Sequence, residues 1–469
     1  MSNKVNLQKL PTGVPGLDTL LEGGISRYSF IVLTGAPGSG KTTLAHQMMF
    51  ALASGQRKAL FFTILGEPPL KMLRFQQQYA FFDPAKVGPA IKYVNLADDL
   101  QKGGFGGVLE RILAEVQSFQ PELIFVDSFK SVVQATRDAD KSLASLQYFV
   151  QQLGVQLSTW QATTFLIGEY ADSTQEENPI FTVADGVIHL CQDMDENAIV
   201  RKVRVVKMRG SNHMTGLHTF RITGDGLQVY PRLLSGGIVN AAEDPTFRTG
   251  AARISTGSAE LDGMLDGGIP VGYSVVVTGP SGCGKTVLAT SFLKAGARVG
   301  EHGIVASFEH GFFYASNAPM QSLIENGHVT EVRPRAFDMS IEEIVSELAA
   351  ATIRTGARRL VIDSLTALEL VLAPQFRANF QQSLFRMLSN LHARGVTVLM
   401  VRNLSDALGQ GFSSSSFIVD CIIAMRYVER DNRMIKLISC PKLRGSAHSN
   451  EVREFVAHAD HIQIAVPAQ

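Results

Sequence analysis

The chain has 469 residues, and its 43 lysines and arginines balance 43 aspartates and glutamates. This balance excludes the overall attraction to nucleic acid or anionic membranes that a strongly basic protein has, so a polyanionic partner would need a local basic patch. The first residues are polar, and no stretch approaches about 18 uninterrupted apolar residues, so we expect a soluble, cytoplasmic protein without a membrane anchor.

In chain order, the first half alternates apolar runs with stretches of helical periodicity. Strands are predicted at residues 30–34, 59–64, 123–126 and 163–168. Helices are predicted at residues 43–49, 107–118 and 139–153. This alternation indicates an α/β fold in which a mainly parallel sheet is flanked by helices. Ligands of such sheets bind outside the carboxyl ends of the strands.

Two segments match the phosphate-binding loop (P-loop) motif G-x-x-x-x-G-K-[ST] in full, at residues 35–42 and 279–286. Each follows a predicted strand and precedes a predicted helix. Backbone N–H groups of such a loop wrap nucleotide phosphates, the lysine lies near the β- and γ-phosphates, and the threonine reaches Mg²⁺. The expected nucleotide-binding residues are Gly35, Gly38, Ser39, Gly40, Lys41, Thr42 and Thr43, and Gly279, Gly282, Cys283, Gly284, Lys285, Thr286 and Val287.

The two loops belong to a longer internal repeat. Thr12-Gly13 and Leu17-Asp18, for example, recur 244 positions later as Thr256-Gly257 and Leu261-Asp262. Landmarks further along each half recur at a slightly shorter offset. We therefore expect two copies of one domain, at residues 1–243 and 244–469, with the boundary near residue 243.

An aspartate ends a predicted strand downstream of each P-loop. These residues, Asp127 and Asp363, stand where a nucleotide site needs a Mg²⁺ ligand beside Thr42 and Thr286. A strand-end aspartate is also a common cap or turn residue. Its recurrence in both copies favours the metal site.

Hydrolysis also needs a carboxylate that orients or deprotonates the attacking water. Glu67 and Glu309 are the candidates, because each follows the predicted strand after its P-loop helix. The alternative is a solvated loop glutamate. Pro68-Pro69 follow Glu67 and His310-Gly311 follow Glu309, so we do not expect equal turnover at the two sites.

Each copy also has a Lys-x-Arg turn after a strand-like run: Lys207 with Arg209, and Lys442 with Arg444. Two cations at positions i and i+2 lie on one side of an extended strand. This placement suits reaching the γ-phosphate of a neighbouring subunit as an arginine finger does. The alternative is an exposed sheet edge with solvated charges.

Together these landmarks, all present twice, resemble the KaiC group of the RecA-like ATPases. The resemblance covers nearly the whole chain and implies two tandem RecA-like P-loop domains that bind ATP and Mg²⁺. It further implies that the copies stack as two rings of a homo-hexamer. ATP would then lie between neighbouring subunits, with each Lys-x-Arg turn facing the nucleotide held next door.

The chain also departs from the clock members of this family. Where they carry two adjacent glutamates, it has Gly66-Glu67 and Glu309-His310. Where they autophosphorylate a Ser-Thr pair, it has Ser416-Phe417, which leaves Ser416 as the possible phosphoacceptor. We also expect no long C-terminal tail of the kind through which clock members receive their activator, and therefore no conventional oscillator.

Three functions follow from the sequence. The leading hypothesis is an ATP-hydrolysing hexameric switch or scaffold that signals to an unidentified partner protein. The second is a Ser/Thr autokinase or protein kinase. The third is a RecA-like DNA-binding recombinase or helicase, which the balanced charge and the absence of a recognisable nucleic-acid module disfavour.

Overall fold

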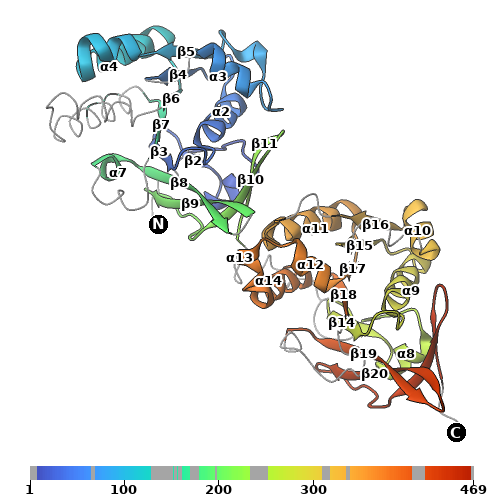
Figure 1. Cartoon of the computed structure of the whole chain (residues 1–469). Coiled ribbons are helices and arrows are strands. Elements are labelled where there is room, and N and C mark those ends of the chain that lie inside the picture. Colours follow the sequence, from blue (N-terminus) through green and yellow to red (C-terminus); the bar gives the residue numbers. More distant parts are fainter. Residues whose placement is uncertain are drawn as a thin grey trace, which may run out of the picture. The chain divides into compact units, whose positions relative to one another are not determined.

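The structure is a computed structural model that describes residues 8–64, 69–127, 152, 156, 161–169, 179–195, 198–232, 252–308, 317–333, 338–403 and 418–465. It forms two compact units, Met1–Arg232 and Leu233–Gln469 (Figure 1). The predicted boundary near residue 243 falls outside the described residues and stays a prediction. Glu67, Glu309 and Ser416 also lie outside them, as does the predicted helix at 139–153 apart from Gln152.

The first unit is built on a nine-stranded sheet with the order β11-β10-β9-β8-β3-β7-β6-β4-β5. Its strands are β3 (Phe30–Gly35), β4 (Ala59–Thr63), β5 (Ile91–Asn95), β6 (Leu123–Asp127), β7 (Thr163–Gly168), β8 (Gly186–Asp195), β9 (Ala198–Met208), β10 (His218–Thr223) and β11 (Gly226–Tyr230). Strands β8 to β5 of this order pair in parallel, and β9, β10 and β11 continue the sheet antiparallel. Two short strands, β1 (Lys9–Leu10) and β2 (Ile25–Ser26), pair separately.

The second unit repeats this sheet in the order β16-β15-β17-β18-β14-β19-β20-β21-β22. Its strands are β14 (Ser274–Gly279), β15 (Gly303–Ser307), β16 (Val329–Val332), β17 (Arg359–Asp363), β18 (Thr397–Asn403), β19 (Cys421–Arg430), β20 (Arg433–Leu443), β21 (Arg453–Ala457) and β22 (Ile462–Ile464). Here β12 (Arg253–Ile254) and β13 (Ile269–Pro270) form the separate pair. Each unit is thus a mainly parallel sheet flanked by helices, which confirms the predicted fold class.

Helices cover both faces of each sheet. Those of the first unit are α1 (Leu17–Leu20), α2 (Lys41–Leu52), α3 (Pro69–Gln76), the 3₁₀ helix η1 (Pro84–Lys86), α4 (Ala97–Phe119) and α7 (Pro179–Val183). Those of the second are α8 (Ala259–Met264), α9 (Lys285–Arg298), α10 (Ala318–Glu325), α11 (Ile341–Thr355), α12 (Leu365–Val371), α13 (Pro374–Arg377) and α14 (Phe380–His392). None of the helices in these described ranges combines the length and hydrophobicity that spanning a bilayer requires.

The core explains why the central strands read as continuous apolar runs. Every residue of β3, β4 and β7 is buried, because helices cover both faces of the sheet. In the first unit α2 packs on one face and α4 on the other. In the second unit α9 packs on one face, and α11 and α14 pack on the other. The predicted helix at 107–118 is the second half of α4.

Candidate nucleotide sites

The first P-loop leads from β3 into α2, as the motif predicts. Gly40 is the N-cap of α2 with φ 99°, a left-handed conformation that favours glycine. A Cβ atom on Gly35 would lie 2.0 Å from the Leu190 carbonyl oxygen, so this position has no space for a side chain. Lys41 Nζ donates to the Ala36 carbonyl at 2.8 Å, which holds the lysine over the loop where phosphates would bind.

The structure brings Thr42 and Asp127 together at the carboxyl ends of β3 and β6. Thr42 Oγ1 donates to Asp127 Oδ2 at 2.8 Å. Burial raises the pKa of Asp127 to about 6, with the Thr42 hydrogen bond and Lys41 opposing the rise and Glu169 adding to it. A hydroxyl and one carboxylate fit Mg²⁺, which usually takes few protein ligands and completes its shell with water and phosphate oxygens. Consistently, no group of three or more His, Cys, Asp or Glu residues among the described residues could enclose a metal alone.

The second P-loop has the same geometry. Lys285 Nζ donates to the carbonyls of Gly279 at 2.9 Å and Pro280 at 2.7 Å. Thr286 Oγ1 donates to Asp363 Oδ2 at 3.2 Å. Cys283, which stands where the first loop has Ser39, is buried, with its Sγ atom 3.8 Å from Lys285 Nζ.

A pocket of about 460 Å³ opens beside the first P-loop. It is lined by five residues that were not predicted as site residues: Tyr79, Gly168, Glu169, Arg201 and Ile222. Glu169 directly follows β7, so it has the same position after an apolar strand that singled out Asp127. In the second unit Asn403 stands at the corresponding place. Thr34 pairs with Gly168, and its counterpart Thr278 pairs with Arg402, so the residues that follow, Glu169 and Asn403, correspond. The two sites therefore differ by one carboxylate.

Arg201 reaches the pocket from β9, a strand whose sequence gave no sign of contact with the P-loop. The corresponding residue of the second copy is Lys436, six positions before Lys442 as Arg201 is before Lys207. Lys436 Nζ donates to the Gly282 carbonyl at 3.4 Å. Each unit thus brings one cation of its own antiparallel hairpin to its own P-loop.

Each Lys-x-Arg turn begins near the end of a strand, with Lys207 on β9 and Lys442 on β20. Lys207 Nζ donates to the carbonyls of Phe181 at 3.0 Å and Thr182 at 3.2 Å, and Arg209 Nη2 donates to that of Thr182 at 3.0 Å. Carbonyls at the C-terminal end of a helix such as α7 lack partners within the helix, and cationic side chains suit them. Burial and the neighbouring Arg209 lower the pKa of Lys207, while Asp185 opposes that shift. In the second unit Lys442 Nζ donates to the Val419 carbonyl at 2.6 Å.

Each turn lies at the opposite edge of its sheet from its own P-loop. Met208 pairs with Gly186 at the start of β8, and Gly186 pairs with Ile31 near the start of β3. The P-loop begins at Gly35, the other end of β3. Gly35 lies five positions after Phe30, and at about 3.3 Å per residue this separation is about 16 Å. The turn and the P-loop of one unit therefore cannot meet at one phosphate group.

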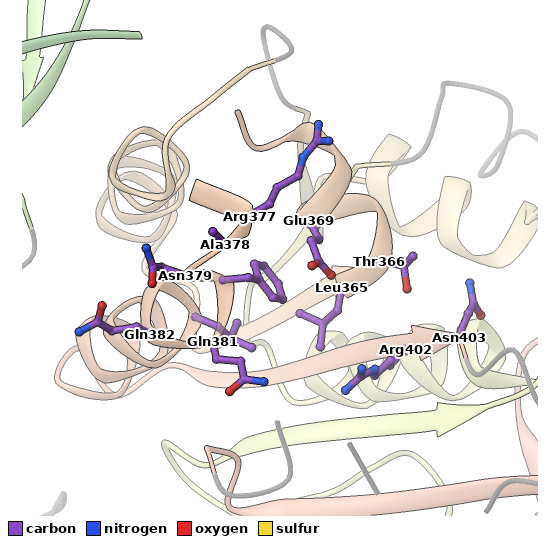
Figure 2. A pocket seen from close by; sticks show the side chains of 12 residues that line it. Leu365, Thr366, Glu369, Arg377, Ala378, Asn379, Gln381, Gln382, Arg402 and Asn403 are labelled. Atoms are coloured by element: carbon purple, nitrogen blue, oxygen red, sulfur yellow. The ribbon is translucent and has the colours of Figure 1, made fainter. Parts of the chain in front are cut away.

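A hollow of about 840 Å³ in the second unit lies beside the ends of α12, α13, α14 and β18. Figure 2 shows Thr366 and Glu369 on α12, and Arg402 and Asn403 at the end of β18, around this space. No described residue of the second P-loop lines it. Its Asn403 is the counterpart of Glu169, so the hollow adjoins the second nucleotide site without including the P-loop.

Comparison of the sequence with known proteins identifies a family that matches both units. Residues 10–233 and 254–469 both match the family model described as "ATPase: KaiC". The chain belongs to the KaiC family of ATPases. This membership confirms the resemblance found in the sequence and the two tandem RecA-like domains.

The similar KaiC proteins cover nearly the whole chain. The circadian clock oscillator protein KaiC of Acaryochloris marina is 25% identical, over 97% of this chain and 88% of that protein. That of Picosynechococcus sp. is 26% identical, over 96% and 88%. The circadian clock protein KaiC3 of Synechocystis sp. is 26% identical, over 98% and 92%.

A buried histidine lies under the first P-loop. His46 of α2 is buried, stacks on Phe61 with ring centroids 4.4 Å apart, and has Nδ1 2.7 Å from the Thr42 carbonyl oxygen. Burial lowers its pKa from 6.5 to about 4, against a smaller opposing effect of that hydrogen bond. In the second unit Thr290 replaces it and donates to the Thr286 carbonyl at 2.9 Å.

We expect acid to destabilise the first unit through His46. The imidazole is neutral in both states at pH 7, and between pH 6.5 and 4 only the unfolded chain takes up the proton. The free energy of unfolding should therefore fall over this range by on the order of 3 kcal/mol more in wild type than in His46→Thr. Denaturant unfolding followed by the fluorescence of Trp160, the chain's single tryptophan, measures this difference. An equal acid dependence in both proteins would contradict it.

Proposed function

We propose that this KaiC-family protein hydrolyses ATP with Mg²⁺ at two sites per chain, in a ring whose conformation reports nucleotide state to a partner protein. The observation that carries the proposal is the placement of the P-loop and the Lys-x-Arg turn at opposite edges of the sheet, which both units share. In both units a P-loop and an aspartate meet at one sheet edge, and a Lys-x-Arg turn lies at the opposite edge.

The residues at each P-loop are those that ATP hydrolysis needs to bind the phosphates and Mg²⁺. The loop N–H groups and Lys41 or Lys285 would hold the phosphates, and Thr42 with Asp127, or Thr286 with Asp363, would hold Mg²⁺. Bound Mg²⁺ would offset the negative charge of the phosphates. Glu67 and Glu309 remain the proposed water-orienting carboxylates, and Glu169 adds a second candidate at the first site.

The second half of each site would come from another subunit. Because about 16 Å of strand separates a Lys-x-Arg turn from its own P-loop, any γ-phosphate that it contacts belongs to a different copy. A contact between unlike edges of identical chains is heterologous, and such contacts form closed rings when the rotation closes. We propose a ring of six, which the resemblance of the sequence to the KaiC group implies.

The two sites should turn over at different rates. The first pocket contains Glu169 where the second copy has Asn403, and the loops differ by Ser39 and Cys283. A carboxylate near the γ-phosphate adds negative charge and a potential proton acceptor, whereas an amide adds neither. We assign the faster hydrolysis to the first site.

Substitutions should separate binding from turnover. Lys41→Ala should abolish nucleotide binding at the first site, because it removes the point charge on the phosphates. Arg209→Ala should preserve binding and reduce first-site kcat by on the order of a hundredfold or more, since it acts only on the transition-state charge. Titration with a fluorescent ATP analogue and ADP counting measure the two effects.

Lys92→Ala is the matched control for both changes. Lys92 lies on β5, at the far end of the strand order from β9, and pairs with Glu115 at 2.7 Å. It should leave both binding and turnover near the wild-type values. If Arg209→Ala hydrolyses ATP as fast as the control, the turn has no catalytic role.

ATP should also drive assembly. Nucleotide held between subunits stabilises the assembled form by about 2.7 kcal/mol per site at a hundredfold excess over its dissociation constant. Light scattering coupled to size-exclusion chromatography should show a hexamer with ATP and Mg²⁺, and smaller species after nucleotide removal. A monomer at saturating ATP and micromolar protein would refute the ring.

A protein kinase is the second candidate function, because Ser416 belongs to the segment between β18 and β19, which are neighbours of the P-loop strand β14. Phe417 offers no hydroxyl at the adjoining position. We therefore expect abundant ADP and at most weak phosphorylation, confined to Ser416. Intact-mass spectra that show stoichiometric phosphoserine, abolished by Ser416→Ala and by Glu309→Gln, would place the kinase first.

A further inference from the structure

We propose that Asp185 and Asp420 are positioning residues that orient Arg209 and Arg444 toward the nucleotide of the neighbouring subunit. Each carboxylate joins the Lys-x-Arg turn to the first residue of the strand whose far end carries the chain's own P-loop. The inference rests on the proposed function and identifies what holds the second half of each site in place.

In the first unit Asp185 connects two chain segments. Its Oδ2 accepts a hydrogen bond from the Phe30 backbone N–H at 3.0 Å, and its Oδ1 accepts one from Arg209 Nη1 at 3.4 Å. The backbone repeats the connection, because Asp185 N donates to the Phe30 carbonyl and Arg209 N donates to the Asp185 carbonyl, both at 2.8 Å. One residue thus fixes both the start of β3 and the turn after β9.

The second unit has the same arrangement with different neighbours. Asp420 Oδ2 accepts from Ser274 N at 3.0 Å, and Oδ1 accepts from Arg444 Nη1 at 3.4 Å. Asp420 N donates to the Ser274 carbonyl at 3.0 Å, and Arg444 N donates to the Asp420 carbonyl at 2.8 Å. Three further bonds are added. Ser274 Oγ donates to Asp420 Oδ2 at 2.7 Å and accepts from Asp420 N at 3.2 Å, and Tyr273 Oη donates to the Arg444 carbonyl at 3.0 Å.

Stability alone does not account for this pairing. The side chains of Asp185 and Arg209 are 35% and 56% exposed, and exposed ion pairs of this length contribute little to folding. A carboxylate can nevertheless restrict a long arginine side chain to a narrow range of directions. Such restriction matters for a group that must meet a phosphate on another subunit, where a misplacement of about 1 Å can cost a hundredfold in rate.

The bond to a buried strand holds the Asp185 carboxylate in a fixed position. β3 is buried along its whole length and hydrogen-bonded to β7 and β8 on its two sides. Its start therefore moves with the sheet, not with the exposed turn. Through Asp185, the direction of Arg209 is set by the same strand that sets the position of Gly35.

The test is Asp185→Asn in the full-length chain, with the second site silenced by Arg444→Ala. The amide oxygen can still accept from Phe30 N, but the amide nitrogen cannot accept from Arg209. We expect first-site kcat to fall about tenfold or more, with ATP affinity and ring size unchanged. Asp193→Asn is the matched control, because Asp193 lies on β8, the strand that begins directly after Asp185, and pairs with Lys202 at 3.0 Å. It should not change kcat.

A double variant separates positioning from a structural role. If Asp185 acts through Arg209, then Asp185→Asn combined with Arg209→Ala should be no slower than Arg209→Ala alone. Multiplied losses, a weakened ATP affinity or a dissociated ring would show that Asp185 acts through the strand, and would overturn the inference.

Mixed rings give an independent measurement. An Asp185→Asn subunit keeps a competent P-loop, so mixing it with Asp127→Asn subunits, whose turns are intact, should restore part of the first-site turnover. No recovery, where Arg209→Ala subunits do recover under the same mixing, would also overturn the inference. If wild type hydrolyses no ATP, the proposed function itself fails. If Arg209→Ala is slow and Asp185→Asn is not, only the positioning role fails.

Discussion

The length of one buried strand is the constraint on which the functional account depends. β3 and β14 each carry a P-loop at the carboxyl end, and the antiparallel hairpin beside them returns the Lys-x-Arg turn to the amino end. Within a unit, the length of the strand therefore keeps the P-loop and the Lys-x-Arg turn about 16 Å apart. A site that uses both must be assembled from two units. We propose that these units belong to two chains, so that nucleotide binding and ring formation would be parts of one equilibrium.

The two units share this arrangement of strand, P-loop and Lys-x-Arg turn, and they differ in the side chains around it. Glu169 and His46 of the first unit correspond to Asn403 and Thr290 of the second. The first site thus has an extra carboxylate at the pocket and a buried neutral imidazole beneath the P-loop helix. The second has neutral side chains at both places. Duplication preserved the geometry, while the charge around each nucleotide became specific to its copy.

The sequence predicted what is encoded locally. The P-loop residues, the strand-end Asp127 and the alternation of strands with helices all depend on short segments, and the structure places them as predicted. Arg201 and Tyr79 reach the first pocket from segments far along the chain, so no motif could reveal them. The same holds for Asp185, whose bond to Phe30 joins positions 155 residues apart. Glu67, Glu309 and Ser416 lie outside the described residues, and their roles stay predictions.

The most direct test of the central claim is an experimental structure of the assembly with a non-hydrolysable ATP analogue and Mg²⁺. The account predicts that the γ-phosphate held by Lys41 and Thr42 of one subunit lies within hydrogen-bonding distance of Arg209 from its neighbour. Arg209 of the same subunit should lie at the far edge of the sheet, bonded to Asp185. A nucleotide whose γ-phosphate contacts no Lys-x-Arg turn of another chain would contradict the account.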